Sequence, residues 1–352
     1  MEKRILVNDI KIGVVGAGSW GTALANLLGL KGYQIDLWAF EKEVKEQIET
    51  YGENRVFLPG FPLSGNVRPS NDIAQVVSGK ELVVLVVPSH VMRETAHKMS
   101  GHLSEKTILV SAAKGIENKT HLTMSGVLQE VLTEIPGNSF AVLSGPSFAR
   151  EVAQKFPTVV TVASKDQKVA EYVQHVFATP YFRVYTGDDI IGVELGGAVK
   201  NVIAIAAGII DGLGLGLNTR AALITRGLAE IRRLGIKLGA NPHTFAGLAG
   251  VGDLVLTCTG DLSRNHTVGK KIGQGMKLNE ILAEMRMVAE GIKTAKSVYN
   301  LSRKLGVEMP IAQEVYYMLY EDISPVEAGR RLMSRDLKQE LDAEDACGKQ
   351  TT

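Results

Sequence analysis

Short apolar runs alternate with amphipathic stretches over the first half of the chain. The expected strands are β-branched and leucine-rich runs at residues 11–15, 35–38, 82–87, 107–111, 140–143 and 158–163. Between them apolar residues recur with a helical period, near 22–30, 71–77, 90–99 and 122–132. Uninterrupted runs such as 82–87 are typical of parallel strands that helices cover on both faces. The pattern predicts an α/β domain with a doubly wound parallel sheet over residues 1–192.

From about residue 190 onward the apolar residues follow a helical period only. Helices are expected at 193–210, 219–234, 243–249, 267–274, 278–284, 294–305, 311–320 and 325–333. The glycine-rich run 212–216 follows no strand, so it is interpreted as a turn between helices. The second half therefore predicts an all-α domain over residues 193–341, and the polar stretch 342–352 is expected to be a disordered tail.

Composition excludes several classes of protein. The 352 residues are 45% hydrophobic and 22% charged with a formal net charge of +1, as expected of a soluble globular protein with two domains. This balance indicates no nucleic-acid or membrane partner, and no apolar run is as long as a membrane span. The N-terminus lacks the apolar core of a signal peptide, so a cytoplasmic location is expected. Two cysteines, Cys258 and Cys347, make neither a disulfide framework nor a metal cluster, and no metal is expected.

Gly16, Gly18 and Gly21 form a Gly-x-Gly-x-x-Gly motif between the first expected strand and the first expected helix. In this setting the motif indicates a Rossmann-like dinucleotide site, because glycine permits the tight turn and lets the backbone approach the pyrophosphate. The N-terminus of the following helix then stabilises the phosphate charge.

Three further loops follow expected strands, at Pro88-Ser89, Lys114-Gly115 and Gly145-Pro146-Ser147. Ligands of open α/β sheets bind at the carboxyl ends of strands, so these loops are candidate cofactor and substrate contacts. That their Pro and Gly residues only make turns is an equally good interpretation of each loop alone.

Lys200 and Asn201 lie in a helix that otherwise consists mostly of Ala, Ile, Val and Gly. Such a helix is expected to be packed on all sides, and burial lowers the pKa of a lysine until it can exchange a proton near neutrality. Lys200 is therefore a candidate general acid/base. The alternative is a lysine that reaches the surface or pairs with a structural carboxylate such as Asp211 or Glu194.

A second cluster follows in the helical half. Asp253 and Thr257 are four residues apart, so on a helix they would face the same way, and the carboxylate could orient Lys200. An N-cap role for Asp253 is the alternative. Ser263 is a good N-cap, and Arg264 adds a fork of donors, which together suit a small dianion such as a phosphate monoester. A solvated basic face is the alternative here.

These motifs together resemble the soluble, bacterial-type NAD(P)-dependent glycerol-3-phosphate dehydrogenases, over about residues 11–341. The matching stretches are 16–23 (GAGSWGTA), 87–89 (VPS), 114–115 (KG), 144–149 (SGPSFA), 197–201 (GAVKN), 250–254 (GVGDL), 263–265 (SRN) and 288–291 (VAEG).

The resemblance implies reversible hydride transfer between NAD(P)H and dihydroxyacetone phosphate, which gives sn-glycerol 3-phosphate for glycerophospholipid synthesis, with Lys200 as the general acid/base. A homodimer is also implied. The implied substrate contacts are Lys114, Gly145, Ser147, Asn201, Asp253, Thr257, Ser263, Arg264 and Asn265. The implied cofactor contacts are Gly16, Gly18, Ser19, Trp20, Gly21, Phe40, Lys114, Ala149, Arg264, Val288 and Glu290.

The choice between NAD and NADP stays open. NAD-specific Rossmann sites place a carboxylate at the end of the second strand, where it holds the ribose 2′-hydroxyl. By spacing, that place is Ala39, followed by Phe40 and Glu41, so neither a clear acid nor a clear base stands there.

Two other functions compete with this one. A related two-domain dehydrogenase could act on a β-hydroxyacid or a ketopantoate-like compound. A redox-sensing protein could bind the nucleotide without turnover, although it would need none of Lys200, Asp253 and Arg264.

Overall fold

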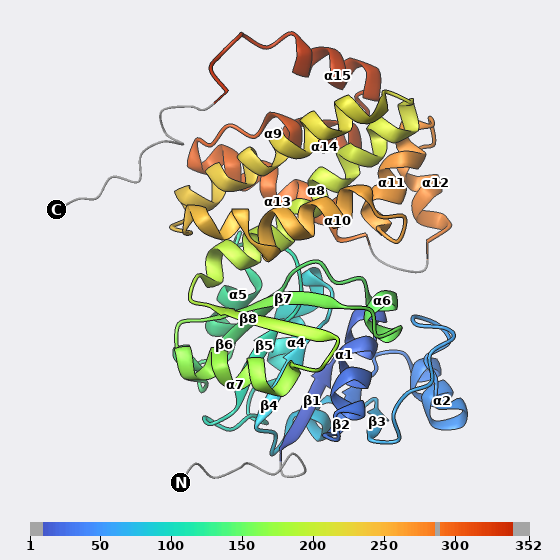
Figure 1. Cartoon of the computed structure of the whole chain (residues 1–352), viewed down its shortest axis with the longest axis vertical. Coiled ribbons are helices and arrows are strands. Elements are labelled where there is room, and N and C mark those ends of the chain that lie inside the picture. The colour runs from blue at the N-terminus through green and yellow to red at the C-terminus, as the bar shows by residue number, and fades with distance from the viewer. Residues whose placement is uncertain (1–9, 286–288, 341–352) are drawn as a thin grey trace, which may run out of the picture.

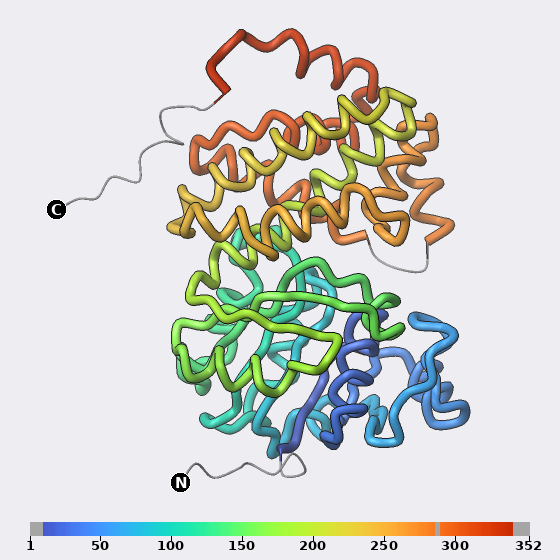
Figure 2. Tube along the Cα trace, viewed as in Figure 1, coloured from blue at the N-terminus to red at the C-terminus, as the bar shows by residue number. Residues whose placement is uncertain are grey.

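The computed structural model describes residues 10–285 and 289–340, which form two halves (Figure 1). One half contains the β-sheet and the other consists of helices. Helix α8 (Ile190–Leu213) leads from the sheet half into the helical half, where the trace then stays (Figure 2). The division into domains at residue 192 stays a prediction, and α8 begins just before it. The predicted tail 342–352 lies outside the described residues.

The sheet has eight strands in the order β3-β2-β1-β4-β5-β6-β7-β8. The first six of these in space follow the Rossmann order, and they are parallel to one another. The strands are β1 Lys11–Val15, β2 Gln34–Trp38, β3 Val67–Ser70, β4 Leu82–Leu85, β5 Ile108–Ser111, β6 Phe140–Ser144, β7 Thr158–Ser164 and β8 Phe182–Gly187.

The expectation of a wholly parallel sheet is wrong at one edge. Strands β7 and β8 pair parallel with each other, but β7 is antiparallel to β6. The chain between β6 and β7 holds only the short helix α6 (Ala149–Ala153), which packs against α1 (Ser19–Leu30). Because no full crossover helix returns the chain to the starting edge, β7 runs back beside β6. The sheet is therefore mostly parallel.

Helices cover both faces of the sheet, and each face has its own apolar core. The central strands are fully buried, as the uninterrupted apolar runs predicted. The edge strands β3 and β8 and the helices α2, α6 and α7 were not predicted. The helices of this half are α1, α2 Lys42–Tyr51, α3 Ile73–Val77, α4 Met92–Met99, α5 Met124–Val131, α6 and α7 Gln167–Phe177, with short 3₁₀ turns at Ser89–Val91 and Gly137–Ser139.

Helix α8 is the centre of the helical half, and its neighbours pack around it. A Cβ atom at Gly208 would lie 2.0 Å from the carbonyl oxygen of His266, so glycine lets the backbone of α8 meet that of α11 (Arg264–Gly273). The other elements are α9 Gly216–Lys237, α10 Asp253–Thr259, α11 Arg264–Gly273, α12 Leu278–Ala283, α13 Glu290–Leu305, α14 Pro310–Tyr320 and α15 Pro325–Met333. The predicted turn at 212–216 is confirmed, because α8 ends at a left-handed Gly214 and α9 begins at Gly216.

The single helix expected at 243–249 is wrong. A 3₁₀ turn, η4 (Pro242–Ala246), is followed by a π-helical turn, η5 (Leu248–Gly252). The extended backbone of Gly247 separates the two. Gly196 of α8 lies so close to η5 that an added Cβ would stand 2.3 Å from the carbonyl oxygen of Ala249. This contact places the start of α10 against α8.

By length and composition alone, α8 could cross a membrane. However, 94% of its apolar window is buried inside the protein, so here it is a core helix.

Candidate active site

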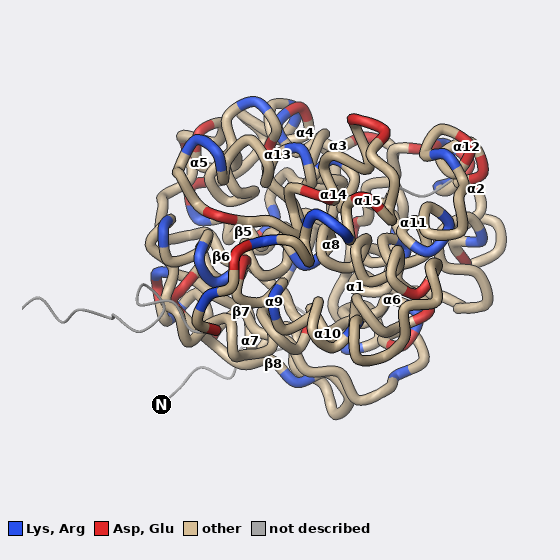
Figure 3. Tube along the Cα trace, turned by 90° about the horizontal axis from the view of Figure 1, so that it is seen from above, with Lys and Arg blue, Asp and Glu red and all other residues tan. Residues whose placement is uncertain are grey.

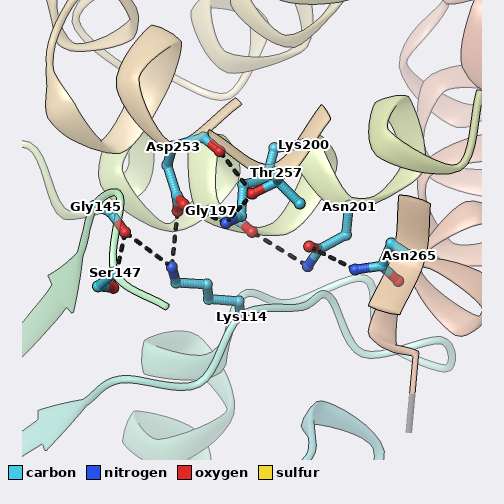
Figure 4. A network of polar contacts seen from close by, with 9 residues as sticks. All are labelled: Lys114, Gly145, Ser147, Gly197, Lys200, Asn201, Asp253, Thr257 and Asn265. Atoms are coloured by element: carbon cyan, nitrogen blue, oxygen red, sulfur yellow. Dashed lines mark hydrogen bonds and ion pairs between the residues drawn. The ribbon is translucent and has the colours of Figure 1, made fainter. Parts of the chain in front are cut away.

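Lys200 lies in the middle of α8, where the helix faces α10, and is only 5% exposed. Its ammonium donates hydrogen bonds to Asp253 Oδ1 and, at 2.8 Å, to Thr257 Oγ1 (Figure 4). The alternative interpretation, in which Lys200 pairs with Asp211 or Glu194, is wrong. Asp211 accepts hydrogen bonds from Arg220 and His266, while Glu194 accepts them from Ser125.

Asp253 and Thr257 share one face of α10, as their spacing predicted. The Thr257 hydroxyl donates to the Asp253 carbonyl at 2.6 Å, which leaves its oxygen free to accept from Lys200. The N-cap alternative for Asp253 is wrong, because Gly252 is itself helical and the π-helical turn continues into α10. The Asp253 carboxylate is instead 1% exposed and accepts hydrogen bonds from two lysines.

Lys114 is the second lysine, and it comes from the sheet half. Its ammonium lies 2.7 Å from Asp253 Oδ2 and donates to the Gly145 carbonyl at 3.2 Å. The Ser147 hydroxyl donates to the same carbonyl at 3.0 Å. Gly145 directly follows β6 and has φ +145°, and an added Cβ would stand 2.9 Å from the Cα of Val160. The loops after β5 and β6 thus meet the helical half at Asp253.

One carboxylate therefore joins two ammonium groups across the boundary between the halves. Burial lowers the pKa of Lys200 to about 7, and the charge of Lys114 acts in the same direction, while Asp253 opposes both. A group with this pKa can give up or take a proton at neutral pH.

A chain of amides continues from Lys200 towards α11. Asn265 Nδ2 donates to Asn201 Oδ1 at 2.9 Å, and Asn265 Oδ1 accepts from the backbone N–H of Gly291. Asn201 Nδ2 contacts the Gly197 carbonyl at 3.4 Å. The two asparagines are buried, so they have fixed orientations beside the two lysines.

Ser263 caps α11, as predicted. Its hydroxyl oxygen accepts from the N–H of His266 at 3.2 Å. Arg264, the first residue of α11, is exposed to solvent, yet the protein around it lowers the pKa of its guanidinium, and the charge of Glu290 opposes this. Arginine keeps its charge throughout the accessible pH range. Lys, Arg, Asp and Glu are interspersed when the protein is viewed from above (Figure 3), so attraction for an anion has to come from local groups such as these.

The glycine motif has the geometry that a dinucleotide needs. Gly16 has φ +118°, and an added Cβ at Gly21 would stand 1.8 Å from the Gly16 carbonyl oxygen, so strand and helix pack tightly. A Cβ at Gly18 would meet nothing within 4 Å, which leaves room for a pyrophosphate at the N-terminus of α1. The buried Trp20 Nε1 has no hydrogen-bond partner within the described ranges, and a ligand could accept from it. These residues fit a nicotinamide nucleotide.

The other predicted cofactor contacts lie around this motif. Ser19 donates to the Phe57 carbonyl at 2.6 Å, and Ala149 begins α6, beside α1. Phe40, just after β2, is 71% exposed and follows a buried Ala39. Val288 lies outside the described residues. Among the residues that are described, no group of three or more His, Cys, Asp or Glu side chains could hold a metal ion.

Of two further contacting residues near the site, Asn54 was not predicted, whereas Ser89 lies in a loop that was predicted as a candidate contact. Asn54 donates to the Ala17 carbonyl at 2.8 Å and to Thr22 at 2.9 Å, which holds the glycine loop. Ser89 donates to Glu290. The position of Ser89 after a strand was a signal, whereas Asn54 lies in a segment without a regular period.

Comparisons with known proteins agree with this architecture. The family model described as NAD-dependent glycerol-3-phosphate dehydrogenase N-terminus matches residues 11–170, and that for the C-terminus matches residues 189–330. The chain is 58% identical over 333 residues to a glycerol-3-phosphate dehydrogenase (NAD(P)+) of Syntrophobacter fumaroxidans, covering 94% of this chain and 97% of that one. It is 58% identical over 330 residues to the enzyme of the same name from Geobacter sulfurreducens, covering 94% and 98%.

A solved structure of glycerol-3-phosphate dehydrogenase from Coxiella burnetii superimposes with a TM-score of 0.90 at 39% identity, covering 94% of this chain and 100% of that one. Both family models and both relatives decide against the keto-acid reductase and the non-catalytic sensor. The chain belongs to the NAD-dependent glycerol-3-phosphate dehydrogenase family.

Proposed function

We propose that Lys200 is the general acid/base of this enzyme. As a member of its family, the protein interconverts dihydroxyacetone phosphate and sn-glycerol 3-phosphate with NAD(P)H. The nicotinamide nucleotide, bound along the glycine motif, supplies the hydride to C2 in reduction and accepts it in oxidation. In reduction the Lys200 ammonium gives its proton to the carbonyl oxygen, and in oxidation the neutral amine takes the hydroxyl proton.

The observation that carries this proposal is the shared carboxylate. Asp253 holds the ammonium groups of Lys200 and Lys114 side by side at the boundary between the halves. The carbonyl of Gly145 contacts Lys114 at the same place. The pKa of about 7 allows Lys200 to be either protonated or neutral under working conditions. The nearby positive charges would also stabilise the alkoxide that develops on the substrate oxygen.

We propose that the substrate phosphate binds at the N-terminus of α11. Its contacts would be the first backbone N–H groups of the helix, with Ser263, Arg264 and Asn265. The residues around Lys200 and Asp253 are assigned to the carbonyl end of the substrate. They are Lys114, Gly145, Ser147, Asn201 and Thr257. Support for both assignments is the link from Asn201 to Asn265, which joins the two ends of the site.

We also infer a homodimer, a cytoplasmic location and a supply of glycerol phosphate for glycerophospholipid synthesis. These three rest on the resemblance of the chain to its family and on composition, and they stay predictions. Sedimentation of the purified protein at several concentrations tests the dimer.

The experiment that tests the function supplies the purified protein with dihydroxyacetone phosphate and, in separate assays, NADH and NADPH. Rapid oxidation with the phosphorylated ketone, and slow oxidation with unphosphorylated dihydroxyacetone, is the expected result. Equal rates with both ketones would contradict the phosphate site, and turnover only with keto acids would contradict the substrate assignment.

A further inference from the structure

Glu290 and Ser89 form a two-point contact between the halves. Ser89 opens the turn after β4, and Glu290 is the first residue of α13. Glu290 Oε1 accepts from the Ser89 backbone N–H at 3.1 Å, and Oε2 accepts from its hydroxyl at 2.6 Å. The serine is 4% exposed and lies 201 positions away from the glutamate in the chain. We call this contact the 89–290 latch.

The latch lies directly behind the loop that carries Lys114. A Cβ added to Gly115 would stand 2.3 Å from Ser89 Cβ and 3.4 Å from Glu290 Oε2, so the loop backbone rests on both side chains. Gly115 follows Lys114 directly. If Ser89 moves away, the backbone next to Lys114 therefore loses this packing contact and can move.

Helix α13 holds the same loop at two further points. The Ser297 hydroxyl donates to the Ile116 carbonyl at 2.8 Å, and Asn118 Nδ2 contacts the Lys293 carbonyl at 3.4 Å. Lys114 thus belongs to the sheet half by sequence, but a helix of the other half supports its loop.

We propose that Ser89 and Glu290 are positioning residues that hold Lys114 against Asp253 through the 89–290 latch. The claim that the latch positions Lys114 is based on the contacts alone. The effect of this positioning on turnover rests on the proposed function. Glu290 is assigned here to the protein contact, in addition to the nucleotide contact implied by resemblance.

A suitable substitution of Glu290 keeps its hydrogen bonds to Ser89 and removes its negative charge. Besides Ser89, the carboxylate faces the charges of Arg264 on α11 and Lys293 on α13, and burial raises its pKa against these influences. A glutamine can reproduce both bonds of the latch, because its oxygen accepts from the Ser89 N–H and its amide N–H donates to the Ser89 hydroxyl. Glu290→Gln should therefore preserve the position of Lys114, and Glu290→Ala should not.

The first test measures how fast an amine-specific reagent labels Lys114 in the nucleotide-free protein, with peptide mass spectrometry as the readout. Lys114 is 19% exposed and ion-paired, so labelling depends on its release from Asp253. Ser89→Ala and Glu290→Ala should raise the labelling rate about tenfold, as expected when a hydrogen bond to a buried charge is lost. Lys98, which is exposed, serves as the internal standard.

Ser302→Ala is the matched control. Ser302 is also a buried serine, on α13, but its hydroxyl donates to the Tyr299 carbonyl within the same helix. This variant and Glu290→Gln should label Lys114 at the wild-type rate. Unchanged labelling in Ser89→Ala and Glu290→Ala would overturn the proposal, as would a rise of the same size in Ser302→Ala.

The second test is the pH profile of dihydroxyacetone phosphate reduction. Lys200 faces Asp253 and Cys258 on α10 and Lys114 on its loop. Because the charge of Lys114 lowers the pKa of Lys200, its withdrawal raises that pKa, and activity should persist to higher pH in Ser89→Ala. A profile that does not move although Lys114 labelling rises would overturn the positioning role. If the wild type reduces no ketone, the proposed function fails while the labelling test still decides the latch.

Discussion

Lys200→Met removes the ammonium at the centre of α8 while it keeps an unbranched side chain of similar length. Asp253 retains Lys114 as a partner in this variant, so no carboxylate is left buried alone. The change therefore isolates the free energy that the folded protein loses by burying the charge of Lys200.

The magnitude follows from the pKa. The pKa of Lys200 is about 7 in the folded protein, against an ordinary 10.5. Each tenfold change in an acid constant is worth about 1.4 kcal/mol, so the charged lysine costs the folded state about 5 kcal/mol. Below pH 7 both the folded and the unfolded chain hold this proton, and the cost is complete. Between pH 7 and 10.5 only the unfolded chain holds it, so the wild type recovers stability as the pH rises.

The assay is urea unfolding of wild type and Lys200→Met at pH 6 and pH 9, followed by both fluorescence and circular dichroism. The advantage of the variant in the free energy of unfolding should be about 3 kcal/mol larger at pH 6 than at pH 9. Lys98→Met, at an exposed i,i+4 pair, is the control and should differ little from wild type at either pH. A difference between variant and wild type that is independent of pH, or that grows as the pH rises, would refute the reasoning.

Three further predictions concern the site. Asp253→Asn removes the charge that raises the pKa of Lys200, so the pH above which ketone reduction falls should move down, and a move upward would contradict the pairing. Arg264→Ala should raise the KM for dihydroxyacetone phosphate about 30-fold, equivalent to about 2 kcal/mol, and a normal KM in steady-state assays would place the phosphate elsewhere. Phe40→Arg puts a guanidinium beyond the end of β2, so the Kd for NADPH measured by fluorescence should fall relative to that for NADH. An unchanged ratio of the two Kd values would show that the ribose lies elsewhere.

The elements predicted best are those whose signals are local. The first strand, the glycine turn and helix α1 follow from a motif of six residues, and the buried strands follow from uninterrupted apolar runs. Strand β3 was missed because its four residues, VRPS, carry a proline that only an edge strand tolerates. Strand β8 was also missed, although buried and exposed residues alternate at its start, which is the pattern expected of a strand.

The partner of Lys200 could not be predicted from its helix. Asp211 lies on the same face of α8 as Lys200, but eleven residues of helix separate the two by about 16 Å, which is too far for an ion pair. Asp253 reaches Lys200 only because glycine contacts bring η5 and α10 against α8. The direction of β7 and the 89–290 latch likewise depend on packing between segments far apart in the chain, for which no local pattern exists.

The central claim is tested most directly by the rate of a single turnover in Lys200→Ala, with nucleotide binding measured on the same sample. The account predicts that NADH or NADPH binds with the wild-type Kd, while hydride transfer to saturating dihydroxyacetone phosphate slows by a factor of about 10² to 10⁴. Hydride transfer at the wild-type rate in this variant would contradict it.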